Sequence, residues 1–189
     1  MHREQPQTIC PGNRNEWRMW LEENHTTIDS VWLVYYKRKS GQPTLTWSDA
    51  VDEALCFGWI DSIKKPLDDD RFMQFFSRRK PTSIWSKINK EKIEKLILNG
   101  LMLPAGLESV ERAKRNGSWT IMNQVEELVI PEDLEKEFAL IPGSQEYFSG
   151  LSKSAKKIIL QSLVLAKRPE TRKKRIEQIM AQMTGKLKQ

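Results

Sequence analysis

The stretch WIDSIKKPLDDDRFMQFFSRR, residues 59–79, decides the fold class of this chain. Two segments that contain aromatic and β-branched residues flank the acidic run Asp68–Asp70, whose side chains favour a turn. The pattern therefore predicts a β-hairpin. Because Pro66 cannot donate a ladder hydrogen bond, its strand is expected to lie at a sheet edge or to end there.

The residues before the hairpin predict one more strand and two helices. VWLVYYKRK, residues 31–39, favours a strand, which gives a small antiparallel sheet of about three strands. Asn13 or Asn15 is expected to cap a helix that carries an apolar stripe of tryptophan and leucine. A second helix is expected to begin at Ser48 and to end at Gly58.

The residues after the hairpin predict helices only. Helices are expected to begin at Ser83, Pro104, Pro131 and Pro169, and another is expected over residues 152–168. Strands and helices do not alternate as in parallel βαβ units, so the predicted fold class is α+β, mostly α. We expect three parts along the chain. They are a loose N-terminal tail (1–12), an α+β domain (13–150), and a basic two-helix C-terminal extension packed on it (151–189).

The composition is typical of a soluble globular protein, with 39% hydrophobic and 30% charged residues among 189. No stretch approaches the roughly 18 apolar residues that a membrane-spanning helix needs, and no secretory signal is expected. The two cysteines, Cys10 and Cys56, have neither a zinc-site nor a disulfide-framework spacing. Together these features predict a cytoplasmic protein.

Positive charge is concentrated at the C-terminus. The whole chain carries a net +6, whereas residues 152–189 hold eleven Lys or Arg and two acidic residues. Six of the basic residues fall within nine positions: Lys167, Arg168, Arg172, Lys173, Lys174 and Arg175. This basic patch is interpreted as a solvated helix face, a nucleic-acid contact or a contact with an anionic membrane surface. Because Arg172 lies in a first helical turn, where positive charge is unfavourable, it is expected to meet a carboxylate or other anion.

One candidate ligand-binding neighbourhood follows from the hairpin. Strand alternation places Trp59 and Asp61 on one face, and the second strand would bring Arg78 or Arg79 close to them. The free N–H groups of the next helix would add an anion site. The predicted ligand-binding residues are Trp59, Asp61, Arg78, Arg79, Ser83, Trp85, Ser86 and Asn89. A structural alternative stays open, in which Asp61 pairs with an arginine and Ser83 caps its helix.

Catalytic and cofactor chemistry has little support in the sequence. No cluster of His, Cys and carboxylates has metal-ligand spacing, and no glycine-rich phosphate loop occurs, so neither a metal nor a cofactor is expected. The apolar surroundings of Cys56 are expected to raise its thiol pKa. Asp61 is the one weak candidate for a general base, so we expect a protein that is not an enzyme and keep an enzyme as the alternative.

Several motifs resemble one family. They are ALCFGWID (54–61), SRRKPTSIWSKINK (77–90), NGLMLPAGLESVERAKRNGSW (99–119) and AKRPETRKKRIEQI (166–179). The chain resembles the YdeI/OmpD-associated family, often labelled bacteriocin-protection or OmdA-type proteins, from about Trp17 to Gly185. It departs from the family pattern at Ser62 and Ser77, where members often carry Gly and Pro.

The resemblance implies a bacterial protein linked to the cell envelope and to tolerance of bacteriocins. It implies no agreed reaction and no agreed catalytic residues. The first hypothesis is a cytoplasmic binding or stress-tolerance protein that recognises a small anionic ligand, or a protein partner, at the candidate neighbourhood. The alternatives are an uncharacterised enzyme that uses Asp61 as a general base and a nucleic-acid binder that uses the basic patch.

Overall fold

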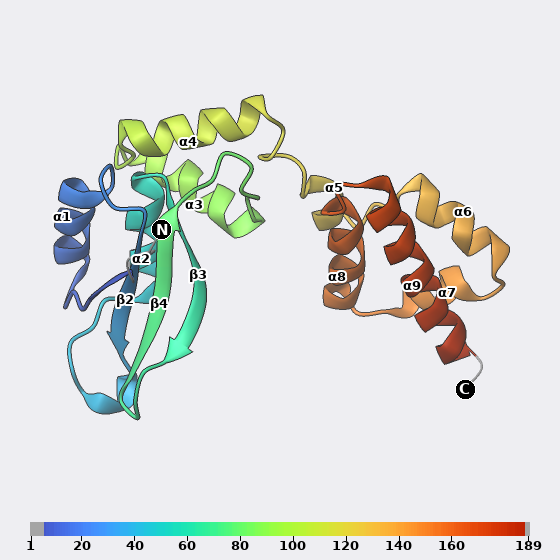
Figure 1. Ribbon diagram of the computed structural model, residues 1–189, viewed down its shortest axis with the longest axis horizontal. Coiled ribbons are helices and arrows are strands. Elements are labelled where there is room, and N and C mark those ends of the chain that lie inside the picture. Colours follow the sequence, from blue (N-terminus) through green and yellow to red (C-terminus); the bar gives the residue numbers. More distant parts are fainter. Residues whose placement is uncertain (1–5, 188–189) are drawn as a thin grey trace, which may run out of the picture. The chain divides into compact units, whose positions relative to one another are not determined.

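The computed structural model describes residues 6–187 and divides the chain into two compact units (Figure 1). The first unit runs up to Trp119 and the second begins at Thr120. The predicted α+β class with mostly helices is confirmed, and the sheet has four strands rather than about three. The predicted division after residue 150 differs from the observed one, because helices on both sides of that position share the second unit.

Residues 6–119, the described part of the first unit, contain the sheet and four α-helices. The elements are β1 (Gln7–Ile9), α1 (Arg14–Asn24), β2 (Ser30–Tyr36), a 3₁₀ turn (Arg38–Ser40), α2 (Trp47–Cys56), β3 (Trp59–Pro66), β4 (Arg71–Arg78), α3 (Lys87–Leu98) and α4 (Pro104–Arg115). The strand order is β1-β2-β4-β3, and β3 and β4 form the predicted antiparallel hairpin. Asp68 holds the hairpin turn, since its Oδ1 accepts hydrogen bonds from the backbone N–H groups of Asp70 and Arg71. The prediction that Pro66 lies in an edge strand is confirmed.

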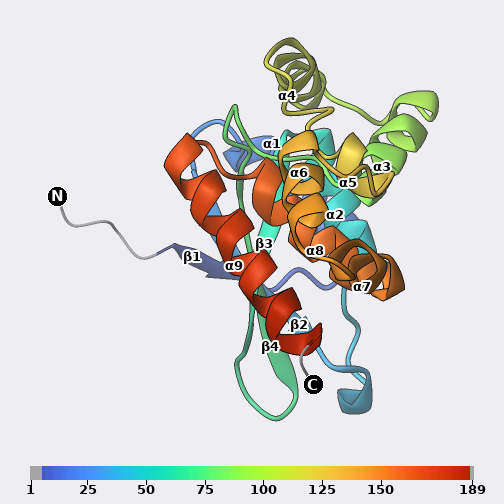
Figure 2. The same ribbon diagram turned by 90° about the vertical axis from the view of Figure 1, so that its right-hand side faces the viewer.

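The sheet is mixed rather than purely antiparallel, because β1, which is labelled in Figure 2, pairs with β2 in parallel register. Residues 7–9 therefore lie in a strand, and the prediction of a loose tail over residues 1–12 is wrong for them. Residues 1–5 lie outside the described part of the chain. Three residues carry no readable alternation, so this edge strand depends on the pairing groups that β2 offers.

The helices α1 and α2 cover one face of the sheet. Trp17 of α1 contacts Phe76 of β4 edge to face at 5.4 Å, and its Nε1 donates to the carbonyl of Ala50 in α2 at 3.0 Å. Strand residues that alternate toward these helices are buried, among them Val31, Leu33 and Phe76. The core thus lies between the sheet and the α1–α2 pair and fixes the inner side of the hairpin.

Side-chain caps explain where the helices start. Asn13 caps α1 as predicted, through a 3.0 Å bond from Glu16 N–H. The predicted caps of the next two helices are wrong: Thr46 caps α2 and Ser86 caps α3. Ser83 instead closes a turn by donating its N–H to the carbonyl of Lys80, so residues 79–86 form an irregular segment before α3.

The second unit consists of helices only within its described residues. They are α5 (Asn123–Glu126), α6 (Glu132–Leu140), α7 (Ser144–Gly150), α8 (Lys153–Val164) and α9 (Pro169–Leu187). The predicted C-terminal helical pair is present as α8 and α9, which lie side by side (Figure 1). Phe138 of α6 and Phe148 of α7 contact each other at 5.4 Å, and α8 buries Leu160 and Leu163.

Candidate functional site

Trp59 belongs to the core. The indole has no exposed surface, contacts Trp20 edge to face at 5.9 Å and donates to the carbonyl of His25 at 3.4 Å. Trp59 therefore lies in the core of the first unit rather than at an open surface where a ligand could reach it. Neither face of this ring is open to a ligand.

Asp61 lies beside Trp59 along β3 and is held by two neutral donors. Its Oδ2 accepts from Trp47 Nε1 at 2.9 Å and from Gln74 Nε2 at 3.1 Å. The predicted cross-strand ion pair between Asp61 and an arginine is wrong among the described contacts. An indole and an amide are neutral donors, so the negative charge of Asp61 is not neutralised by them. This charge acts electrostatically on the Arg79 guanidinium.

Arg78 and Arg79 point to different environments. Arg78 is exposed and forms an ion pair with Asp29. Arg79 is only 6% exposed, and its Cζ lies 3.6 Å from the centroid of the Trp85 ring. Its Nη1 donates to the carbonyl of Ile84 at 3.0 Å. Two contacts thus fix the plane of the Arg79 guanidinium.

The Nε and Nη2 atoms of Arg79 are buried and have no hydrogen-bond partner among the described residues. Burial lowers the pKa of Arg79 to about 10, and the Asp61 carboxylate opposes this decrease. The group is therefore cationic at neutral pH. Nε and Nη2 form one edge of the guanidinium fork, the edge that can bind two oxygens of a carboxylate or phosphate. Buried donors without a partner are costly, so this edge is the strongest candidate for ligand recognition in the first unit.

The other predicted ligand residues divide between the Arg79 cluster and the start of α3. Trp85 is buried and contacts Trp119 at 5.0 Å as well as Arg79. Ser86 accepts from Asn89 N–H at 3.2 Å, so these two residues form a helix cap. Ser83 lies in the irregular segment and is half-buried. The structure thus brings Arg79 and Trp85 into contact, near the Asp61 charge.

A second buried charge cluster was not predicted. Glu53 of α2 is 2% exposed, and its carboxylate accepts from Arg14 Nε at 2.5 Å and from Arg18 Nη1 at 2.7 Å. Arg14 and Arg18 are four residues apart on α1, which is a readable signal for two cations on one helix face. Burial and Glu53 raise the pKa of the nearby Cys56 thiol to about 11, in the direction predicted.

The basic patch contains two structural arginines. Arg172 forms a fork with Asp133 of α6, with Nη2 to Oδ1 at 2.8 Å, and donates to the carbonyl of Leu163 at 2.9 Å. The expectation that Arg172 meets a carboxylate is confirmed. Arg175 donates to the carbonyl of Ser162, so both arginines satisfy carbonyls at the end of α8. The remaining members are exposed: Lys167, Arg168, Lys173 and Lys174.

The described residues provide no cluster for metal coordination. Between residues 6 and 187, no three or more His, Cys, Asp or Glu side chains come together as metal ligands would. Over the same residues, every helix is too short or too polar to cross a membrane.

Comparisons with known families assign each unit. Residues 9–109, more than half of the chain, match the family described as "Domain of unknown function (DUF8412)". Residues 127–185 match the family described as "Bacteriocin-protection, YdeI or OmpD-Associated". The resemblance stated above is thus confirmed over residues 127–185, whereas the motifs at 54–61 and 77–90 lie within the other match. Neither the curated proteins nor the solved structures give a significant match. The chain therefore belongs to the DUF8412 family and carries a YdeI/OmpD-associated region in its second unit.

Proposed function

We propose that the chain is a non-catalytic, cytoplasmic binding protein whose first unit recognises a small oxyanion through Arg79. The link to bacteriocin protection comes from the description of the family that matches residues 127–185. The observation that carries the proposal is the buried Nε–Nη2 edge of Arg79, which has no partner among the described residues.

The surroundings of Arg79 support an anion rather than a neutral ligand. The guanidinium is already oriented by Trp85 and by the carbonyl of Ile84, so little side-chain entropy is lost on binding. Removal from water strengthens a charge-assisted pair of hydrogen bonds. A carboxylate or phosphate group supplies two oxygens at the spacing of the fork.

The irregular segment 79–86 is the proposed entrance. It carries both Arg79 and Trp85 and contains neither helix nor strand. Asn116 Nδ2 donates to the carbonyl of Pro81 at 2.7 Å and holds the segment against α4. A ligand would reach the fork when this contact opens.

The two alternatives have less support. Asp61 Oδ2 already accepts two hydrogen bonds, so a general base at this position would have to act through Oδ1. The nucleic-acid hypothesis loses Arg172 of the six basic residues, because its guanidinium is paired with the Asp133 carboxylate.

Thermal unfolding in phosphate, sulfate or acetate tests the proposal, with chloride at matched ionic strength as the reference. We expect oxyanions to raise the Tm of the wild type and Arg79→Lys to weaken phosphate binding roughly 10- to 100-fold, because lysine keeps the charge without the fork. Arg78→Lys is the matched control, since Arg78 is exposed and paired with Asp29. An equal Tm response in the wild type and Arg79→Lys would exclude Arg79 as the site.

A further inference from the structure

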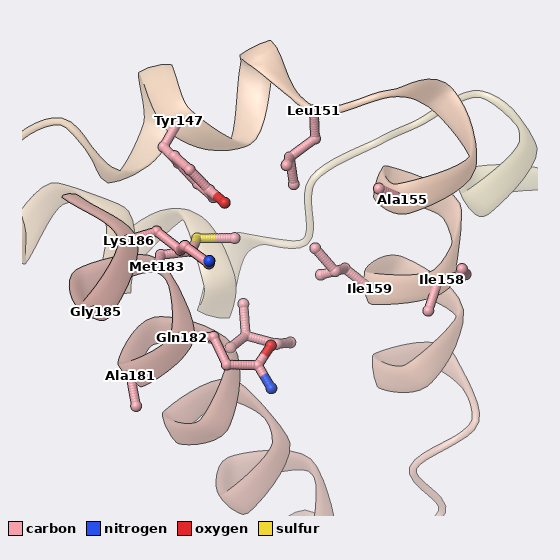
Figure 3. Close-up of a pocket in the computed structure, with 11 residues that line it drawn as sticks. Tyr147, Leu151, Ala155, Ile158, Ile159, Ala181, Gln182, Met183, Gly185 and Lys186 are labelled. Carbon is pink, nitrogen blue, oxygen red and sulfur yellow. The ribbon is translucent and has the colours of Figure 1, made fainter. Parts of the chain in front are cut away.

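An open groove runs between α8 and α9 of the second unit, and it is apolar near α7 and more polar toward Arg175. One hollow of about 570 Å³ is lined by residues of α7, α8 and α9, including Tyr147, Leu151 and Lys186 (Figure 3). A second hollow of about 540 Å³ continues along the same two helices toward Leu165 and Arg175. Four residues line both hollows and make them one groove: Ile158, Ile159, Ile179 and Gln182.

The groove is apolar and accessible along its middle. Ile158 is 70% exposed although it lines both hollows, and Ile159 stands beside it on the α8 wall (Figure 3). A single exposed isoleucine is ordinary, but Ile158 lies in a concave surface next to the half-buried Ile159, and apolar side chains gathered in a hollow mark an interaction site. From Leu151 to Leu165 the groove is about 20 Å long at the helical rise, which fits a partner helix of about four turns.

The positive charge along the groove favours a partner with acidic residues. Among the described residues, no Asp or Glu lines either hollow, whereas a cation lines each of them: Lys186 the first and Arg175 the second. In Figure 3 the Lys186 amine and the Tyr147 hydroxyl lie beside the same hollow. An acyl chain is apolar on all sides, so in such an open groove one of its sides would stay exposed to water. An amphipathic helix can instead place its apolar face in the groove and its polar face in water.

We propose that this groove binds an amphipathic helix of a partner protein, with apolar anchors at i, i+3, i+4 and i+7 and acidic residues on its flanks. The acidic flanks face Lys186 and Arg175, and the apolar anchors cover Ile158 and Ile159. The groove lies in the second unit and does not involve Arg79, so a test of the groove does not depend on the proposed anion site.

Fluorescence anisotropy with labelled synthetic peptides tests the inference on the full chain. The probe is a 16-residue helix with leucines at the anchor positions and glutamates on the flanks. A second peptide carries lysines in place of the glutamates. We expect the acidic peptide to bind at least about tenfold more tightly than the basic one at low salt and Ile158→Gln to weaken it by roughly tenfold.

Leu140→Gln is the matched control, because Leu140 is 72% exposed in α6 and lines neither hollow. Lys186→Glu is expected to reverse the preference between the two peptides. Equal affinity for both peptides, or unchanged binding by Ile158→Gln, would overturn the inference. So would self-association that requires Ile158, or binding of laurate without binding of the acidic peptide, since each identifies a different occupant.

Discussion

At the scale of single residues, the two neighbouring arginines at the end of β4 show how burial separates identical side chains. Arg78 is exposed and pairs with Asp29, whereas Arg79 is buried against Trp85. Strand alternation sends the two side chains to opposite sides of the sheet. Identical side chains therefore form a surface ion pair at one position and, at the next, a buried cation whose Nε and Nη2 have no partner among the described residues.

Glu53 is the buried carboxylate whose loss should cost most. In Glu53→Gln, Arg14 and Arg18 lose their shared anion, and we expect the free energy of unfolding to fall by about 2 kcal/mol, because both arginines keep some contact with water. Urea denaturation measures the change. Glu22→Gln is the control, since Glu22 makes only a surface pair with Arg18 at 3.3 Å and should cost less than about 0.5 kcal/mol. Equal losses in both variants would contradict the buried role of Glu53.

At the scale of elements, a close backbone contact joins α2 to α4. The carbonyl of Cys56 accepts from Leu103 N–H at 3.2 Å, which satisfies one of the free carbonyls at the end of α2. A Cβ at Gly106 would lie 2.3 Å from that same carbonyl oxygen. Gly58 turns the chain with a φ of 74°, and a Cβ there would lie 3.0 Å from the carbonyl of Ala105. The close packing of α2 against α4 therefore requires a glycine on each partner, Gly58 after α2 and Gly106 in α4.

Gly106→Ala is expected to lower the free energy of unfolding by about 3 kcal/mol, because the methyl group forces α4 away from α2. Chemical denaturation measures this loss. Gly150→Ala is the control, since no atom lies within 4 Å of a Cβ built at Gly150, and its effect should stay below about 1 kcal/mol. A Gly106→Ala variant as stable as the wild type would show that the two helices separate at little cost.

At the scale of the whole molecule, each unit has its own core and its own family match. Trp17 and Phe76 lie in the core of the first unit, and Phe138 and Phe148 lie in that of the second. The match over residues 9–109 falls in the first unit, and the match over 127–185 falls in the second. Folding and recognition are therefore expected to be separable between the units.

Calorimetry is expected to resolve two unfolding transitions, with Gly106→Ala lowering one and Asp133→Asn lowering the other. The hydrogen bond from Arg172 lowers the pKa of Asp133 below its ordinary value of 3.8. The ion pair therefore stabilises the second unit at pH values above 3.8, and this stabilisation is lost as the pH falls through the lowered pKa. The effect of Asp133→Asn should be about 1 kcal/mol at neutral pH, since both groups are partly exposed, and should vanish in acid. A single transition that both variants shift would contradict independent units.

Much of the fold was predictable from local pattern. The hairpin followed from two strand-forming segments around three turn aspartates, and the helical half followed from apolar stripes bounded by proline and glycine. The caps at Thr46 and Ser86 and the strand at residues 7–9 were missed. Several serines and threonines can cap equally well in isolation, and three residues form a strand only where a partner edge is present.

The sequence by itself determined the α+β class, the antiparallel hairpin and the meeting of Arg172 with an anion, because each depends on contacts between near neighbours or on helix electrostatics. Only the tertiary structure decided that Arg79 is buried with no partner for its Nε–Nη2 edge among residues 6–187, that Trp59 belongs to the core, and that α8 and α9 leave a groove. Burial and partnership depend on which distant segments pack against a side chain. The local pattern of residues does not specify that packing.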